Sequence, residues 1–283
     1  MWEGTSTPRT GAARALPDDP RPAGRSAAFF DLDKTIIATT SATAFSRPFL
    51  AGGLLTRGDM VRTAYAQFLY LVGGADAEQT ERLRARLSAV STGWDVETVR
   101  AIVAETIHVH IDPVVYAEAV ELIATHHAAG RDVVVVSASG SEVVEPIAAL
   151  IGADHVLATR LEAIDGRYTG EIDFYCYGEN KALAMRELAE REGYDLAESF
   201  AYSDSITDTP MLEAVGNAIV VNPDRTLRRL AEERGWQAAR FTHPQPLSER
   251  LRPVVPAATV SAVVVALGVA ALVWRVLRKR RKA

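Results

Sequence analysis

The sequence predicts an α/β fold built on a doubly wound parallel sheet. Four short apolar runs alternate with helix-like stretches, and polar side chains follow these runs at their carboxyl ends. Continuous apolar strands are typical of parallel sheets that helices cover on both faces, and such Rossmann-like sheets bind ligands beyond the carboxyl ends of their strands. A composition of 48% hydrophobic and 24% charged residues over 283 residues supports a globular chain with a substantial core.

The N-terminal segment differs in composition from the rest of the chain. Residues 1–26 are rich in Pro, Gly, Arg and Ala without apolar periodicity, so we expect a disordered leader. No apolar h-region follows the start, and therefore no cleaved signal peptide is predicted. The first strand begins at Ala27, and we place the folded core, with its insertion, at 27–245.

The connection after the first strand is too long for a simple crossover. About 100 residues separate Asp31 from the next core strand at Val133, where a dozen or so would suffice. This segment contains four amphipathic patterns with glycine-containing breaks between them. The four helices that we predict are Ala42–Leu50, Gly58–Val72, Asp76–Val90 and Trp94–His108. They indicate an all-helical cap at about 40–111, inserted above the strand ends.

The rest of the core continues the alternation of strands and helices. Further strands are predicted at 132–137, 199–204 and 218–221. Asp112 followed by Pro113 is typical of a helix start, and this helix would end at Gly130. A second helix is predicted from Lys181 to a stop at Gly193.

The C-terminal region predicts a membrane anchor. Val254–Trp274 carries no charge over 21 residues and would span about 30 Å as a helix. A linker at 246–253 precedes it, and a basic tail with six Lys or Arg follows at 275–283. The positive-inside bias would place the core outside the cell, whereas the missing export signal favours a cytoplasmic core. We give the missing signal more weight; an interfacial helix on anionic headgroups stays open as an alternative.

Charge and cysteine content narrow the classes of partner. The net charge is -5 although the tail is strongly basic, so the core is acidic and nucleic acid is not expected as a partner. Cys176 is the single cysteine, which excludes an internal disulfide and a cysteine zinc cluster. We interpret it as a packing residue.

Polar residues cluster at the predicted strand ends. They are Asp31, Asp33, Ser137, Ser203, Asp204 and Asp208, with Lys181 at a helix start. Ser137 alone could cap a helix, Lys181 could be a surface charge, and Asp208 could begin a helix. Together they predict one site, because several carboxylates at one sheet edge repel each other unless a cation joins them. Mg²⁺ fits, because it prefers carboxylate, carbonyl, water and phosphate oxygens.

Such a site points to phosphoryl transfer. The reaction needs an in-line nucleophile, neutralised phosphoryl oxygens and an acid for the leaving group. Two aspartates at positions i and i+2 of an extended segment face the same side and can divide this work. One would stay ionised on the metal and attack phosphorus, and the other would hold a proton.

The order and spacing of these residues resemble a known family. "FFDLDKTII", "VVVVSAS", Lys181 and "YSDSITD" look like the four motifs of the haloacid dehalogenase superfamily. The insertion after the first motif resembles subfamily IB, the phosphoserine phosphatase-like branch, as do "LATRLEAIDGRYTGEI" and "YSDSITDTPMLEAVGNAIVVNPD". The similarity covers Ala27 to about Gly235.

This resemblance implies roles for the clustered residues. Asp31 would be the nucleophile that forms an aspartyl-phosphate, and Asp33 the general acid and then base. Ser137 would donate a hydrogen bond to the phosphoryl group, and Lys181 would steady the charges of nucleophile and phosphate. The implied Mg²⁺ ligands are Asp31, the backbone carbonyl of Asp33, and Asp204. Asp208 would orient Lys181 or a metal-bound water, with Ser203 beside it.

The segment after the aspartate pair departs from the phosphoserine phosphatases. Those enzymes carry a glutamate there that receives the serine ammonium, whereas "ATTSATAF" offers hydroxyl and apolar groups. The sequence therefore does not predict phosphoserine as substrate, and leaves open a small metabolite or a lipid headgroup phosphate. A catalytically silent, membrane-tethered binding protein is the alternative. The full set of site residues argues against it, and a dehalogenase is disfavoured because Asp33 serves an oxygen leaving group.

Overall fold

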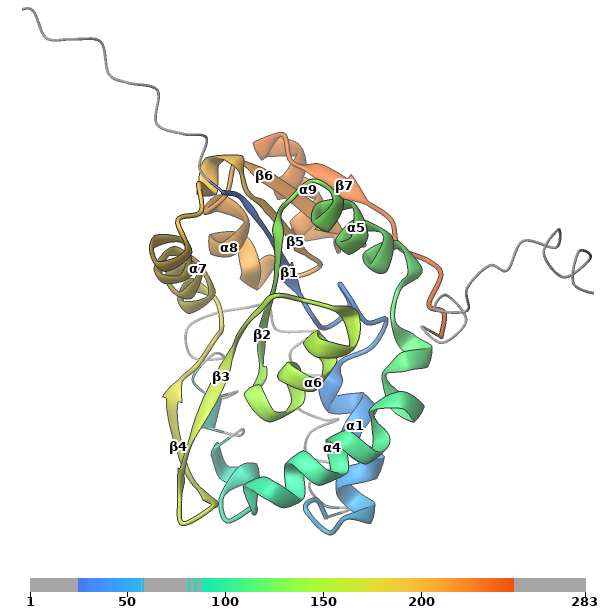
Figure 1. The fold of residues 1–283 in the computed structure, drawn as a ribbon, viewed down its shortest axis with the longest axis vertical. Coiled ribbons are helices and arrows are strands. Elements are labelled where there is room, and N and C mark those ends of the chain that lie inside the picture. The colour runs from blue at the N-terminus through green and yellow to red at the C-terminus, as the bar shows by residue number, and fades with distance from the viewer. Residues whose placement is uncertain (1–24, 57, 59–80, 82–83, 86–87, 247–283) are drawn as a thin grey trace, which may run out of the picture.

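A seven-stranded sheet forms the centre of the protein (Figure 1). The structure is a computed structural model that describes residues 25–56, 58, 81, 84–85 and 88–246. The strand order is β4-β3-β2-β1-β5-β6-β7, with β1 in the middle. The strands are β1 (Ala27–Asp31), β2 (Asp132–Gly140), β3 (His155–Ile164), β4 (Arg167–Phe174), β5 (Phe200–Ser203), β6 (Asn217–Val221) and β7 (Gln237–Ala239).

The α/β Rossmann-like core predicted from the sequence is confirmed, with one change to the sheet. The predicted strands correspond to β1, β2, β5 and β6, and these pair in parallel. The sequence reasoning missed β3, β4 and β7 as strands. Because β4 runs antiparallel to β3, the sheet is mixed at this edge and not wholly parallel. A two-residue turn at Asp165 and Gly166, with φ of 50° and 76°, joins these two strands into a hairpin.

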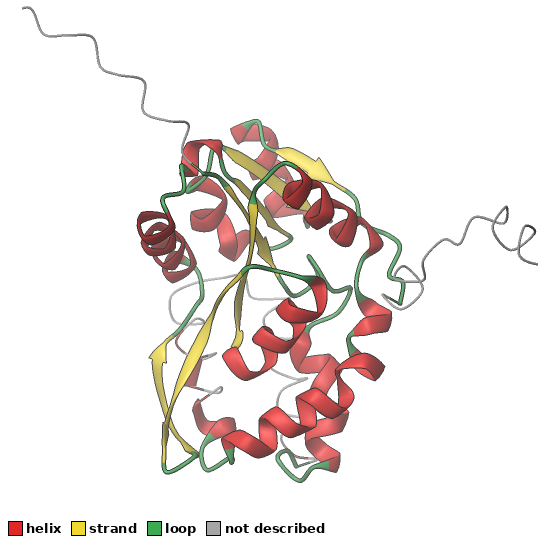
Figure 2. Cartoon of the chain, viewed as in Figure 1, coloured by secondary structure: helices red, strands yellow, loops and turns green. Residues whose placement is uncertain are grey.

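Helices cover both faces of the sheet (Figure 2). Side chains alternate along β1, so that Ala28 and Phe30 pack on one face, and Ala27 and Phe29 on the other. The first face is covered by α5 (Ala117–Ala128) and α6 (Ser141–Ile151), and the second by α7 (Glu179–Glu192), α8 (Thr209–Glu213) and α9 (Arg225–Arg234). The short apolar strands are therefore buried on both sides, as the composition of the runs predicted.

The start of α5 differs from the prediction. Asp112 and Pro113 begin a 3₁₀ turn, Asp112–Val114, and the α-helix starts only at Ala117. The cause is a contact with the segment after β1, because the Tyr116 N–H donates to the Ile36 carbonyl at 2.9 Å. This pairing holds the residues before Ala117 in an extended conformation. The segment that leaves the cap therefore lies beside the segment that enters it.

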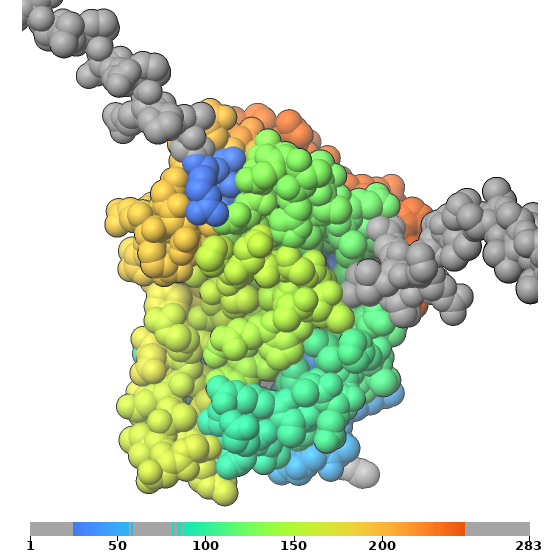
Figure 3. All heavy atoms as spheres, in the orientation of Figure 1, coloured from blue at the N-terminus to red at the C-terminus, as the bar shows by residue number. Residues whose placement is uncertain are grey.

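Two helices of the predicted cap lie in the described residues. They are α1 (Ser41–Ala51) and α4 (Val96–His110), each within two residues of its predicted bounds. Most of the two middle helices, 58–72 and 76–90, falls outside the described residues. In the space-filling view, α4 and α6 lie against each other and form one continuous surface with α5 (Figure 3).

The predictions for the two ends of the chain fall mostly outside the described residues. Arg25 was assigned to the leader, yet it belongs to the folded part, because its carbonyl accepts a hydrogen bond from the Asp195 N–H at 2.7 Å. The rest of the leader, residues 1–24, lies outside the described residues, as do the membrane segment 254–274, the basic tail and nearly all of the linker. Within the described part of the chain, no helix has the length and apolar character needed to span a membrane.

Candidate active site

The site is built at the carboxyl ends of β1, β2 and β5, where the strand order reverses. Asp31 is the last residue of β1, and a tight loop follows it. The Leu32 carbonyl accepts hydrogen bonds from the N–H groups of Ile36 and Ile37 at 2.9 and 3.1 Å, and Lys34 adopts a left-handed conformation with φ of 61°. This folded loop keeps Asp33 at the same edge of the sheet as Asp31.

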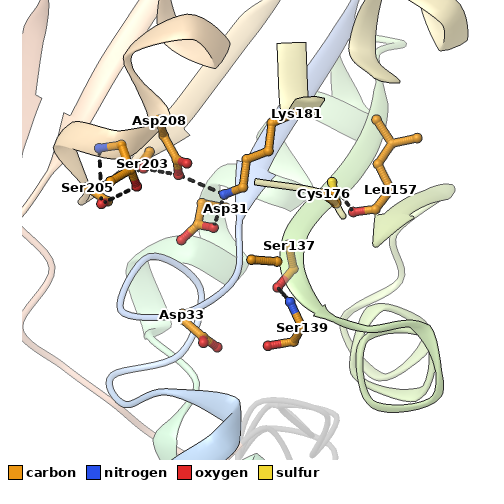
Figure 4. A network of polar contacts seen from close by, with 12 residues as sticks. Asp31, Asp33, Ser137, Ser139, Leu157, Cys176, Lys181, Ser203, Ser205 and Asp208 are labelled. Carbon is orange, nitrogen blue, oxygen red and sulfur yellow. Dashed lines mark hydrogen bonds and ion pairs between the residues drawn. The ribbon is translucent and has the colours of Figure 1, made fainter. Parts of the chain in front are cut away.

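Lys181 joins two buried carboxylates (Figure 4). Its Nζ donates to Asp31 Oδ1 at 2.6 Å and to Asp208 Oδ2 at 2.8 Å. The Lys181 side chain is 3% exposed, and that of Asp31 is 9% exposed. The sequence predicted that Lys181 begins a helix. In the structure this helix, α7, begins at Glu179, and Lys181 is its third residue. The ammonium group therefore fixes one oxygen of Asp31 and leaves the other without a donor among the described residues.

The end of β5 supplies the second half of the site. The Ser203 hydroxyl donates to Asp208 Oδ2 at 2.7 Å, and its oxygen accepts a hydrogen bond from the Ser205 N–H at 3.1 Å. Asp208 is buried at the end of a 3₁₀ turn, Ile206–Asp208, and α8 follows it. Ser203 and Asp208 thus form a fixed support for Lys181, while Asp204 lies between them in sequence.

The end of β2 contributes hydroxyl groups. Ser137 is buried, and its oxygen accepts a hydrogen bond from the Ser139 N–H at 3.2 Å, which leaves the Ser137 O–H able to donate elsewhere. The sequence analysis did not identify Ser139 or Ser41, although both belong to this network: the Ser41 N–H donates to Asp33 Oδ1 at 2.8 Å. Their position next to the motif residues was the only signal in the sequence.

Cys176 lies behind the site and is fully buried. Its thiol donates to the Leu157 carbonyl at 3.5 Å, and burial raises the pKa of the thiol to about 12. A neutral, enclosed thiol is unreactive as a nucleophile. The prediction that Cys176 is a packing residue agrees with this environment.

The electrostatics of the site reflect a surplus of negative charge. Burial raises the pKa of Asp31 well above its usual value; Lys181 opposes this rise, and Asp208 and Asp204 add to it. Burial likewise raises the pKa of Asp204, to about 7, with Lys34 acting against the rise. Burial alone would lower the pKa of Lys181, but Asp208 and Asp31 raise it, so its ammonium stays protonated.

Asp33 has a different environment from Asp31. Burial raises the pKa of Asp33, and the hydrogen bonds from Ser41 act in the opposite direction. A raised pKa favours the protonated carboxylic acid, which is the form that a general acid must hold before it transfers its proton. The two aspartates thus differ in their partners: Asp31 contacts a cation, whereas Asp33 contacts neutral donors.

The donor set fits Mg²⁺. No group of three His, Cys, Asp or Glu side chains in the described residues could hold a metal ion by itself. The predicted set, however, contains only two side-chain carboxylates, Asp31 and Asp204, together with the Asp33 carbonyl. Mg²⁺ is commonly bound by one or two carboxylates and completes its shell with water and phosphate oxygens. A divalent cation would also offset the cost of burying these two carboxylates and the repulsion from Asp208 that adds to it. The ligand set stays a prediction.

This arrangement defines a class of enzyme. A carboxylate held by a buried ammonium, a second carboxyl two residues later and a free hydroxyl meet at the switch point of an α/β sheet. These are the parts that a hydrolase needs to move a phosphoryl group to a carboxylate and then to water.

Comparison with known proteins assigns the family. Residues 28–213 match the haloacid dehalogenase-like hydrolase family, and the chain belongs to it. The chain is 56% identical over 256 residues to a probable phosphatase of Mycobacterium tuberculosis, covering 90% of this chain and 88% of that protein. It is 36% identical over 217 residues to a phosphoserine phosphatase of the same species, covering 76% and 70%. The protein is a phosphatase.

A solved structure shows the same fold. It is described as a phospho-aspartyl intermediate analogue of phosphoserine phosphatase, and it superposes with a TM-score of 0.57. The match covers 81% of this chain and 98% of that one at 21% sequence identity. This likeness shows that the two proteins share the fold.

Proposed function

We propose that the protein hydrolyses phosphomonoesters with Mg²⁺ through an aspartyl-phosphate at Asp31. The observation that carries this proposal is the buried Lys181 bridge, which holds Asp31 Oδ1 at 2.6 Å and leaves Oδ2 free to attack. A binding protein without activity has no need for this bridge together with Ser137 and Asp33 at one sheet edge. No described feature favours that alternative.

The reaction has two steps. In the first, Asp31 Oδ2 attacks phosphorus, the bond to the leaving oxygen breaks, and Asp33 gives its proton to that oxygen. In the second, Asp33 takes a proton from water, whose oxygen attacks phosphorus and releases inorganic phosphate and the Asp31 carboxylate. Ser137 donates to a phosphoryl oxygen, and Lys181 compensates charge on Asp31. Asp31, Asp204 and the Asp33 carbonyl would hold Mg²⁺, which would neutralise charge on the phosphoryl oxygens.

The direct test is phosphate release from 4-nitrophenyl phosphate. We expect turnover with Mg²⁺ and its loss after chelation, because the carboxylate-rich site requires a divalent cation to accept a phosphate dianion. Adding Mg²⁺ back should restore the rate. Turnover that persists in chelator would contradict the metal requirement, and binding without any turnover would favour the silent binding protein.

The substrate preference should differ from that of the phosphoserine phosphatases. Ala38–Phe45 contains no carboxylate, and Thr40 serves as the N-cap of α1, where its oxygen accepts from the Thr43 N–H at 3.1 Å. We expect kcat/KM for phosphoserine within about tenfold of that for 3-phosphooxypropanoate, which lacks only the amine. A site built around a charged partner rejects an analogue without it by about 10⁴-fold. A preference of that size for phosphoserine would refute this prediction.

We also propose that the full-length protein is held at the membrane by Val254–Trp274, with the catalytic core in the cytoplasm. The uncharged run supports the membrane position, whereas the positive-inside bias of the basic tail would by itself place the core outside the cell. A membrane position would favour lipid or membrane-proximal phosphates as substrates. Fractionation should recover the full-length chain with membranes, and deletion after about Arg252 should release an active soluble domain. Digestion of the core by protease added to intact cells would overturn the orientation.

A further inference from the structure

Ser41 occupies an unusual place between the cap and the general acid. It is the first residue of α1, the helix that opens the cap, and it is 1% exposed. Its N–H donates to Asp33 Oδ1 at 2.8 Å, and its hydroxyl lies 3.3 Å from Asp33 Oδ2. The same hydroxyl lies 2.7 Å from the hydroxyl of Ser139, which lies two residues after Ser137 near the end of β2.

These contacts are not those of an ordinary helix cap. The capping function in α1 belongs to Thr40, whose side chain accepts the Thr43 N–H. The Ser41 N–H is one of the first-turn donors that a helix leaves without an internal acceptor. Here the acceptor is the carboxyl group of Asp33. The start of the cap helix is therefore fastened to the residue that must deliver a proton.

The hydroxyl protons can form one directed chain. Each serine hydroxyl has one proton to donate and can accept as well. Ser139 can donate to the Ser41 oxygen, and Ser41 can then donate to Asp33 Oδ2. The Ser139 N–H meanwhile donates to the Ser137 oxygen at 3.2 Å. One continuous network thus joins the general acid, the cap helix and the phosphoryl-facing end of β2.

We propose that Ser41 is a positioning residue that fixes the orientation of Asp33 by docking the first turn of α1 against it, with Ser139 as the second anchor. The inference rests on the proposed phosphomonoesterase activity. A carboxyl group held on both oxygens cannot rotate freely about its side-chain bonds, so it keeps one orientation for proton transfer.

The kinetic test compares two leaving groups in Ser41→Ala. The 4-nitrophenolate group departs with little need for a proton, whereas an alkoxide such as that of glycerol phosphate needs one. The ratio kcat/KM reports the first phosphoryl transfer, in which Asp33 acts as an acid. We expect kcat/KM of Ser41→Ala to fall at least about tenfold with glycerol phosphate and less than about threefold with 4-nitrophenyl phosphate. The larger loss is part of the rate enhancement that a general acid provides. Ser139→Ala should shift the same ratio in the same direction.

A matched control lies on the same helix. Ser46 also carries a hydroxyl on α1, but this hydroxyl donates to the Thr43 carbonyl at 2.7 Å, away from Asp33. Ser46→Ala should leave the ratio of the two kcat/KM values unchanged. Equal losses on both substrates in Ser41→Ala, or no loss on either, would overturn the positioning role. Ser139→Ala decides the question in the same way if Ser41→Ala does not fold.

Failure of this inference can be told apart from failure of the proposed function. If the wild type shows no turnover, the proposed function itself is wrong. If the wild type is active and Asp33→Asn depends strongly on the leaving group while Ser41→Ala and Ser139→Ala do not, only the positioning role is wrong.

A second measurement does not depend on activity. Residue-resolved hydrogen exchange should show faster exchange of the Ser41 amide in Asp33→Ala than in the wild type, because that amide loses its acceptor. The Leu227 amide, which donates to Asp224 in the remote helix α9, is the internal reference. An unchanged Ser41 amide in Asp33→Ala would contradict the docking.

Discussion

Asp31→Asn should reduce turnover of 4-nitrophenyl phosphate by a factor on the order of 10³ or more, as expected when a nucleophile is removed. The amide keeps an oxygen that can accept the Lys181 hydrogen bond, so the fold should persist. It cannot, however, form the acyl phosphate that the first step requires. Phosphate release at saturating Mg²⁺ measures the effect.

The control is an exposed aspartate outside the site. Asp173→Asn on β4 makes the same chemical change at an exposed position, and its activity should stay close to that of the wild type. Hydroxylamine added during turnover should convert an acyl phosphate to a hydroxamate on the peptide that contains Asp31, detectable by mass spectrometry. Undiminished turnover in Asp31→Asn would remove the covalent step from the mechanism.

Residues with a strong local signal could be placed from the sequence. Short apolar runs such as Ala27–Asp31 are buried on both faces in the fold, and their polar ends meet because parallel strands share one carboxyl edge. Asp31, Lys181 and Asp208 are far apart in sequence and yet touch in the structure. The resemblance to the haloacid dehalogenase motifs supplied their roles, which the periodicity alone could not.

The β3–β4 hairpin shows what pattern reading missed. Its sequence contains Asp165-Gly166, a strong signal for a tight hairpin turn between alternating residues. Its strands carry exposed charged residues such as Arg160 and Glu171, so they lack the continuous apolar pattern of buried parallel strands. The late start of α5 had no local signal at all, since a tertiary hydrogen bond from Tyr116 to Ile36 decides it.

The hydroxyl network was beyond the reach of the sequence for a similar reason. Ser41 and Ser139 are separated by 98 positions, and serine is common in loops and at helix starts. Only the register of β1 against β2, with Asp31 opposite Val136, brings the loop after β1 beside the end of β2. The register thus sets which hydroxyl groups can reach Asp33.

Lys181→Met should destabilise the protein by roughly 3–5 kcal/mol in the absence of Mg²⁺, the range typical of breaking a buried ion pair. Methionine replaces the aliphatic stem, but it leaves Asp31 and Asp208 without their shared cation. The pKa of Asp31 is already raised by burial and would rise further in this variant.

The loss should grow with pH. A carboxyl group whose pKa is higher in the folded state than in the unfolded state favours folding at low pH, and this contribution disappears as the pH rises through the folded pKa. The stability deficit of Lys181→Met relative to wild type should therefore be larger at pH 8 than at pH 5. Urea unfolding at both values of pH measures it. A deficit that is the same at both would contradict the ion-pair explanation.

Two variants separate this charge effect from other consequences of the substitution. Arg186→Met removes a cation from an exposed position of α7 and should change stability by no more than about 0.5 kcal/mol. Adding Asp208→Asn to Lys181→Met removes one of the stranded charges, and the amide oxygen can still accept from the Ser203 hydroxyl. The double variant should regain on the order of 2 kcal/mol of stability. Activity should stay lost, because Asp31 would lack the ammonium that compensates its charge and orients it for attack.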